Sequence, residues 1–294
     1  MTDLTKSKSS LSGGLVLLNE VKHKLPPSER KLADFIIQHP HEVIYMTVAQ
    51  LGEASSTSSA AVVRLCKSLG LKGFQELKLR ISGDLHKDQE DHFSDIHPGE
   101  NQESIVQKVT NNSIQAIKET TELVNYEALG KAVQALQNAQ RIHFFGVGAS
   151  GIIAQDAQQK FIRMNKETSA FSDIHNAGMY IANAKSTDVV VGISFSGETE
   201  ETAKIMGLAR ARGATTISLT RYGASPVTQH AEINLFISAS REIPAPFRSG
   251  ATSSRLAQLH MIDILFTSVV TNQYKEASIY LEEIKSAMDY LKKK

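Results

Sequence analysis

The stretch Ile142-His143-Phe144-Phe145-Gly146-Val147-Gly148-Ala149-Ser150-Gly151 decides the fold of the larger part of this chain. Its apolar run predicts a buried strand, and the glycines that follow predict a tight turn into a helix. Short apolar runs recur at 189–193, 215–219 and 233–237, and helical patterns separate them. Strands that alternate with helices predict an α/β fold with a doubly wound parallel sheet.

Length and composition narrow the class of protein. The 294 residues are enough for about two domains at ~150 residues each, and the formal net charge of +1 argues against a basic tail or an acidic disordered chain. Cys66 is the single cysteine, which excludes an intramolecular disulfide and a cysteine-rich zinc site. The polar start lacks the apolar core of a signal peptide, and no run of about 18 apolar residues predicts a membrane span. We therefore expect a cytoplasmic protein without a membrane partner.

Changes in composition and hydrophobic periodicity along the chain predict five segments. Residues 1–14 are polar and predict a disordered start, and residues 15–91 show helical patterns throughout. Residues 92–130 predict a linker with connecting helices, and residues 131–271 contain the predicted strands. Residues 272–294 predict a C-terminal helix. The expected fold class is thus an α/β protein with an all-α N-terminal domain.

The N-terminal domain shows the pattern of a helix-turn-helix. Thr47 and Gln50 fit a capping box, Ser58 fits the N-cap of a third helix, and Gly70 fits its end. In that third helix, one stripe is apolar and the opposite face is small at its start and basic farther on, which suits a helix that enters the major groove. A basic stretch is also typical of a plain solvated face. The predicted contacts with double-stranded DNA are Ser58, Ser59, Ala60, Val63, Arg64, Lys67 and Lys72.

Two runs in this domain resemble a known family. The runs are Ser28-Glu29-Arg30-Lys31-Leu32-Ala33-Asp34-Phe35-Ile36 and, farther on, residues 63–78, which read VRLCKSLGLKGFQELK. Both resemble the DNA-binding domain of the RpiR family of transcriptional regulators. The resemblance implies that residues 15–91 bind operator DNA.

Two predicted strand-to-helix loops carry the chemistry of the second domain. The first loop satisfies G-x-G-x-x-G, and Asp173 follows about 20 residues later, which leaves a dinucleotide site as one alternative. The second loop, Ser194-Phe195-Ser196-Gly197-Glu198-Thr199, offers three hydroxyls at a helix start. Such a loop is often only a helix cap. Two loops of this kind at the switch point of a sheet of order 2-1-3-4-5 favour a compact phosphate.

The same loops resemble the sugar isomerase (SIS) domain over about residues 131–271. The first loop matches its first phosphate-loop motif, and the second loop matches its second. The resemblance implies that a phosphosugar effector is held through its phosphate. The phosphate-binding residues that it implies are Gly148, Ala149, Ser150, Ser194, Ser196, Gly197 and Thr199.

A further comparison with SIS enzymes concerns catalysis. Those enzymes place an acid/base glutamate at the entry to a late helix, where this chain reads Thr252-Ser253-Ser254-Arg255. The nearest upstream acid is Glu242, and a hydroxyl is a poor proton shuttle at neutral pH. We therefore expect no catalytic residue, no cofactor and no metal. Asp173, His175 and Arg255 are candidate contacts for the sugar.

A helix-turn-helix followed by a SIS domain is the layout of RpiR-family regulators. Residues 156–160 (DAQQK) and 251–259 (ATSSRLAQL) resemble the members that respond to N-acetylmuramic acid 6-phosphate. The resemblance implies a repressor of amino-sugar catabolism that acts as a homodimer or homotetramer. The alternatives are a phosphosugar isomerase or lyase with an accessory helical domain and, less favoured, a nicotinamide-dependent oxidoreductase.

Overall fold

A computed structural model describes residues 13–85, 99–239 and 252–292. The chain divides into two compact units, and each is described by itself. The first unit comprises residues 1–111 and 121–123, and the second comprises residues 112–120 and 124–294. Most of the expected disordered start, part of the expected linker and Glu242 lie outside the described residues. The domain boundaries expected from the sequence stay a prediction.

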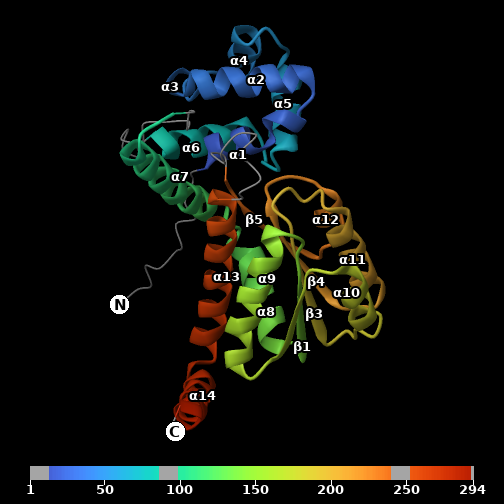
Figure 1. The fold of residues 1–294 in the computed structure, drawn as a ribbon. Helices are drawn as coiled ribbons and strands as arrows, with labels where there is room; N and C mark the ends of the chain where they lie inside the picture. The colour runs from blue at the N-terminus through green and yellow to red at the C-terminus, as the bar shows by residue number, and fades with distance from the viewer. Residues whose placement is uncertain (1–12, 86–98, 240–251, 293–294) are drawn as a thin grey trace, which may run out of the picture. The chain divides into compact units, whose positions relative to one another are not determined.

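The first unit is entirely helical where it is described (Figure 1). The long helix α7, which spans Gln102–Leu123, is shared by both units. The other elements of the first unit are α1 (Gly14–Val21), η1 (Lys22–Lys24), α2 (Pro27–Gln38), α3 (Pro40–Val43), α4 (Val48–Ala54), α5 (Ser59–Ser68) and α6 (Phe74–Leu85).

The caps expected around the helix-turn-helix are present. Thr47 and Gln50 form a capping box at the start of α4, and Ser58 Oγ accepts a hydrogen bond from Ala61 N at the start of α5. Gly70 follows the end of α5 with φ +68°, a conformation that glycine adopts without a Cβ clash. These caps fix a short turn between α4 and α5.

The apolar stripe of α5 forms part of the core of the first unit. Val62, Leu65, Cys66 and Leu69 are buried, together with Leu32 of α2. Burial raises the pKa of the Cys66 thiol to about 11, so this cysteine is a packing residue. The stripe orients α5 so that its opposite face points to solvent.

The second unit contains a five-stranded sheet in the order β2-β1-β3-β4-β5, and every neighbouring pair is parallel. The doubly wound α/β fold expected from the sequence is therefore confirmed. The strands are β1 (Arg141–Phe145), β2 (Glu167–Phe171), β3 (Asp188–Ile193), β4 (Thr215–Arg221) and β5 (Ile233–Ile237).

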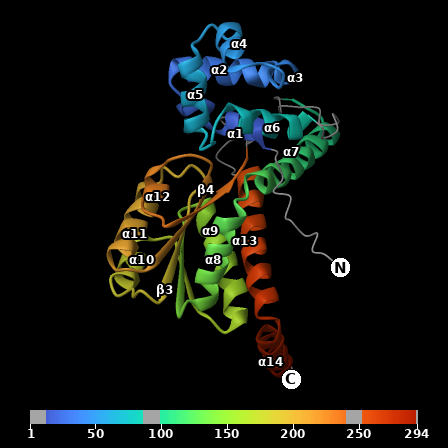
Figure 2. The same ribbon diagram turned by 180° about the vertical axis from the view of Figure 1, so that it is seen from behind.

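Helices cover both faces of this sheet (Figures 1 and 2). One face packs against α8 (Tyr126–Asn138), α9 (Ala149–Phe161) and α13 (Ser253–Asn272). The other face packs against α10 (Ile174–Ile181), α11 (Glu200–Ala211) and α12 (Pro226–Gln229). The short helix η2 (Ile162–Met164) follows α9, and α14 (Tyr274–Lys292) follows α13.

Strand β2 was not among the apolar runs in the sequence. It reads Glu167-Thr168-Ser169-Ala170-Phe171, and its residues are half-buried or exposed because it lies at the edge of the sheet. An edge strand does not need the continuous apolar run that a central parallel strand needs. The central strand β3, in contrast, is buried at all six residues.

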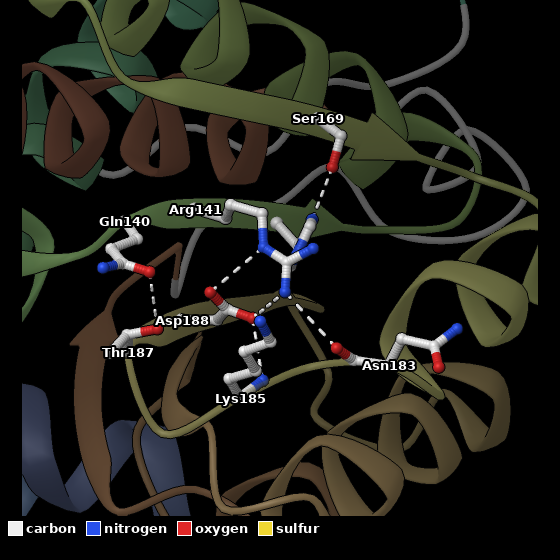
Figure 3. A network of polar contacts seen from close by, with 8 residues as sticks. Gln140, Arg141, Ser169, Asn183, Lys185, Thr187 and Asp188 are labelled. Atoms are coloured by element: carbon white, nitrogen blue, oxygen red, sulfur yellow. Dashed lines mark hydrogen bonds and ion pairs between the residues drawn. The ribbon is translucent and has the colours of Figure 1, made fainter.

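A polar network fixes the amino ends of β1 and β3 (Figure 3). Arg141 at the start of β1 donates two hydrogen bonds to the carboxylate of Asp188 at the start of β3, at 2.6 and 3.2 Å. Burial alone raises the pKa of Asp188, but the hydrogen bonds from Arg141 and from Lys185 N outweigh it and leave the pKa lowered. The network holds the strands in register at the edge opposite the predicted ligand loops.

None of the helices within residues 13–85, 99–239 and 252–292 combines the length and apolar character that crossing a membrane requires.

His143 of β1 gives the stability of the second unit a pH dependence. Its side chain is 4% exposed, Nδ1 lies 2.6 Å from Ser169 Oγ, and Nε2 is buried without a hydrogen-bond partner among the described residues. Burial lowers the pKa of His143 below its ordinary value of 6.5. The unfolded chain therefore takes up this proton first as the pH falls.

We predict that this contribution is fully present above pH 6.5 and is lost as the pH falls below it. Between pH 6.5 and the lowered pKa of the folded state, the free energy of unfolding falls by up to about 1.4 kcal/mol per pH unit for this one group. Urea unfolding of the wild type and of His143→Gln between pH 5 and 8 checks this. The stability difference between the two proteins should shrink or reverse toward acid, and a constant difference contradicts the prediction.

Candidate functional site

The first candidate loop joins β1 to α9 at the carboxyl edge of the sheet. A Cβ at Gly146 would lie 2.6 Å from the carbonyl oxygen of Ser150, so the close turn needs glycine there. Gly148 is the N-cap residue of α9 and gives this helix no side-chain cap. The first amides of α9 therefore have no side-chain cap and follow a glycine, which is the arrangement that binds anions.

The second candidate loop joins β3 to α11 and is held by its own hydroxyls. Ser194 Oγ lies 2.9 Å from Thr199 Oγ1 and accepts a hydrogen bond from Gly197 N at 3.2 Å. Ser196 Oγ accepts from Glu198 N at 3.2 Å. Ser194 is buried, whereas Ser196 and Thr199 are half-buried. Ser194 therefore shapes the loop, while Ser196 and Thr199 have surface from which they can reach a ligand.

The two loops are neighbours because β1 and β3 pair directly. The chain passes from β1 to β2 on one side and then returns to β3 on the other, so the strand order reverses at this point. In doubly wound sheets, ligands bind beside the carboxyl ends of the strands at such a switch point. The structure thus brings together the glycines and hydroxyls of 148–150 and 194–199.

Helix α13 contacts the first loop through Gln258, which was not among the residues predicted from the sequence. Gln258 is buried, and its Nε2 donates to Ser150 Oγ at 3.3 Å. Ser253 and Ser254 are buried in the first turn of α13, and Arg255 is half-buried beside them. The spacing of Gln258, one turn after Ser254, was the signal available in the sequence. The start of α13 therefore lies beside the candidate phosphate loop.

The other two candidate sugar contacts, Asp173 and His175, are both exposed. Asp173 is exposed and caps α10 by accepting a hydrogen bond from Asn176 N at 2.8 Å. His175 is exposed in the first turn of the same helix. Asp173 thus has a structural role at the carboxyl end of β2 whatever ligand binds. Glu242 lies outside the described residues.

A buried polar cluster joins α7 to the carboxyl end of β5. Ser238 Oγ donates to Glu119 Oε2 at 2.7 Å, and Ser238 N donates to Thr120 Oγ1 at 3.1 Å. Gln115 Nε2 donates to the other oxygen of Glu119 at 3.0 Å. All three residues of the first two contacts are buried. This contact could not be predicted from local sequence patterns because its partners lie more than 100 residues apart.

The exposed face of α5 is the second candidate surface. All seven predicted DNA contacts, from Ser58 to Lys72, are exposed. Arg64 is 55% exposed, and its Nε lies 3.6 Å from Oε1 of the buried Glu29 of α2. Ser68 Oγ donates to the other carboxylate oxygen at 2.8 Å. Glu29 therefore restrains the base of Arg64 and leaves part of its side chain open to solvent.

Residues 56–80 contain five basic residues, and the last two of them, Lys78 and Arg80, are bound within the unit. Lys78 Nζ donates to Met46 O, and Arg80 pairs with Glu76 at 3.2 Å. The basic excess that α5 and the turn after it offer to a partner is thus carried by Arg64, Lys67 and Lys72. Among the described residues, no group of three histidine, cysteine or carboxylate side chains is arranged to hold a metal ion.

We predict that Gly197→Ala destabilises the second loop more than a matched glycine change does. Gly197 has φ +71°, and a Cβ there would overlap Ser225 Oγ and lie 2.7 Å from Ser225 Cβ. Gly213 has φ +81° but has no atom within 4 Å of a built Cβ. Gly213→Ala should cost about 1 kcal/mol of backbone strain, and Gly197→Ala should cost at least about 1 kcal/mol more. Equal losses in urea unfolding contradict this packing.

Comparison with known proteins assigns both units to families. Residues 12–88 match the helix-turn-helix domain of the rpiR family, and residues 135–268 match the SIS domain. An uncharacterized HTH-type transcriptional regulator of Bacillus subtilis, YbbH, is 47% identical over 96% of this chain and 99% of its own length. The HTH-type transcriptional regulator HexR of Pseudomonas aeruginosa is 31% identical over 92% of this chain and 95% of its own length.

A solved structure agrees with these matches. The Vibrio vulnificus NanR protein complexed with ManNAc-6P is 26% identical, with a TM-score of 0.60, over 95% of this chain and all of that one. The identity of the relatives extends across the helix-turn-helix and the sheet alike. The chain therefore belongs to the RpiR family of helix-turn-helix transcriptional regulators with a SIS domain.

Proposed function

We propose that the protein is a repressor of amino-sugar catabolic genes and that a phosphosugar controls its affinity for operator DNA. The observation that carries the ligand class is the pair of loops at the carboxyl ends of β1 and β3. Helices α9 and α11 start at these loops without a side-chain cap. The hydroxyls of Ser150, Ser196 and Thr199 lie in the same segments. Backbone amides and hydroxyls donate to phosphate oxygens without adding a charge.

We propose N-acetylmuramic acid 6-phosphate as the effector. NanR of Vibrio vulnificus, which is similar along nearly the whole chain, is complexed with another N-acetylated sugar phosphate, and this supports the ligand class. N-acetylmuramic acid also carries a carboxylate. Arg255 is the candidate for that group because it lies in the first turn of α13, three residues before the Gln258 that contacts Ser150.

We assign the SIS unit a binding role without turnover. Residues 252–255 bring hydroxyls and one guanidinium to the start of α13 and no carboxylate. The buried carboxylate of Glu119 accepts hydrogen bonds from Gln115 and Ser238. A carboxylate held in this way is suited to fixing α7 rather than to moving protons of a sugar.

Helix α7 is the element proposed to couple the two functions. It runs without a break over 22 residues, of which Gln102–Asn111 belong to the first unit and Asn112–Thr120 to the second. Its contact with Ser238 lies at the carboxyl edge of the sheet, the edge that carries the ligand loops. A ligand that favours one position of this edge would shift α7, and through it the geometry of the DNA-binding unit.

We predict that Lys67→Ala lowers operator affinity about tenfold and lowers the salt dependence by about one counterion. Arg64→Ala should lower affinity by at least tenfold, since a lost base contact costs roughly 1–3 kcal/mol. The matched control is Lys204→Ala, which removes an exposed lysine paired with Glu200 in the second unit. Fluorescence anisotropy on a duplex selected by the wild type from a random library measures these changes. Unchanged affinity in both α5 variants contradicts the DNA assignment.

We predict that Ser196→Ala weakens binding of N-acetylmuramic acid 6-phosphate at least tenfold and leaves DNA affinity without ligand unchanged. The control Thr187→Ala removes a hydroxyl at the opposite edge of the sheet, where it contacts Gln140. Calorimetry with this ligand, N-acetylmannosamine 6-phosphate and inorganic phosphate separates sugar from phosphate recognition. If Ser196→Ala binds and responds like the wild type, the phosphate-loop assignment is wrong. Turnover of aldose or ketose phosphates would contradict the binding-only role.

A further inference from the structure

Glu29 is a buried carboxylate that lies behind the exposed face of α5. The residue is in the first turn of α2 and is 4% exposed. The helix dipole favours an anion in a first turn, but a buried carboxylate also needs hydrogen bonds or an opposite charge. Both come from α5, because Ser68 Oγ donates to one oxygen at 2.8 Å and Arg64 Nε lies 3.6 Å from the other.

The pair of Arg64 and Glu29 carries no net charge. A cationic side chain is attracted to DNA phosphates by its charge and by the counterions that the contact releases. A carboxylate 3.6 Å from the guanidinium opposes this attraction. It opposes a contact with an uncharged base edge much less. The pair is therefore better suited to a base than to a phosphate.

The donors that remain on Arg64 match one base in particular. The ion pair uses Nε, and in the part of the chain that the structure describes the guanidinium has no other ion-pair or hydrogen-bond partner. Nη1 and Nη2 are thus left to donate in parallel. In the major groove, guanine alone offers two neighbouring acceptors, N7 and O6. Ala60 is exposed one helical turn before Arg64, and its short side chain allows α5 to approach the bases there.

We propose that Glu29 is a positioning residue that makes Arg64 specific for a guanine of the operator. This inference rests on the proposed function, because it requires α5 to enter the major groove. Glu29 itself does not contact the DNA. It holds Nε of Arg64, leaves Nη1 and Nη2 for the base, and weakens the competing contact with a phosphate. Lys67 lies three residues later without a paired carboxylate and takes the phosphate contact.

The first experiment compares Glu29→Gln with the wild type on two duplexes, the operator selected from a random library and a duplex of unrelated sequence. Loss of the carboxylate charge allows Arg64 to pair with phosphates. We expect the ratio of operator affinity to unrelated-duplex affinity to fall at least tenfold. The slope of log affinity against log salt on the unrelated duplex should steepen by about 0.9, the value for one added phosphate contact.

Asp34→Asn is the matched control. Asp34 is exposed on the same helix, and its variant makes the same change in charge. The affinity ratio of this variant should stay as in the wild type. Thermal unfolding checks that Glu29→Gln is folded. Arg64→Lys is a second variant that leaves the buried carboxylate in place, and it should also lower the ratio at least tenfold, because a lysine cannot offer two parallel donors.

The second experiment identifies the base. Each guanine of the operator is replaced in turn by 7-deazaguanine, which lacks the N7 acceptor and keeps its Watson–Crick pairing. At least one replacement should weaken binding of the wild type about fivefold or more. Binding of Arg64→Ala should not change on the same replacement, because the partner of that N7 is already absent.

Two results overturn the inference. One is a Glu29→Gln variant that loses affinity for both duplexes by the same factor with an unchanged salt slope, which is what a purely structural role predicts. The other is an operator in which no guanine depends on both its N7 and Arg64. A wild type that selects no duplex contradicts the proposed function itself. Failure of this inference is therefore distinguishable from failure of the proposed function.

Discussion

The turns that follow β1 and β3 each contain one position with no room for a Cβ, and the ligand edge depends on this constraint. At Gly146 the backbone of the next helix approaches too closely for a Cβ, and at Gly197 the side chain of Ser225 does. Each turn therefore leads from the carboxyl end of a buried strand into the start of a helix through a short loop. Because β1 and β3 are neighbours, two helix starts converge on one small volume. Phosphate recognition in this family of sheets is thus built mainly from backbone, with a few hydroxyls added.

The DNA-binding unit relies on a different device, a buried carboxylate. Glu29 of α2 accepts from Ser68 and pairs with Arg64, so it links α2 to both ends of the basic part of α5. A buried carboxylate is stable only where its charge is compensated. The pairing holds the Arg64 side chain near one conformation, which reduces the entropy lost when it meets a base. Among the described residues, the Lys67 side chain has no ion-pair or hydrogen-bond partner, and it is suited to the flexible contact that a phosphate needs.

Much of this architecture was predictable from local signals. Capping residues, the α5 stripe and the apolar runs of β1, β3, β4 and β5 are features of short sequence windows, and the structure confirms the strand order that they indicate. Strand β2 was implied by the expected order 2-1-3-4-5, but no apolar run marked it, because an edge strand carries little apolar pattern. The contacts of Gln258 with Ser150 and of Ser238 with α7 escaped because residues more than 100 positions apart meet only after folding.

The central claim is that one phosphosugar site and one DNA surface share a coupling free energy. Its most direct measurement is a closed thermodynamic cycle on the full chain. The operator dissociation constant is measured with and without saturating N-acetylmuramic acid 6-phosphate, and the ligand dissociation constant is measured with and without operator. Coupling through the fold predicts that both ratios are equal and lie at about fivefold or more. Two ratios of one, with both partners bound, would contradict it.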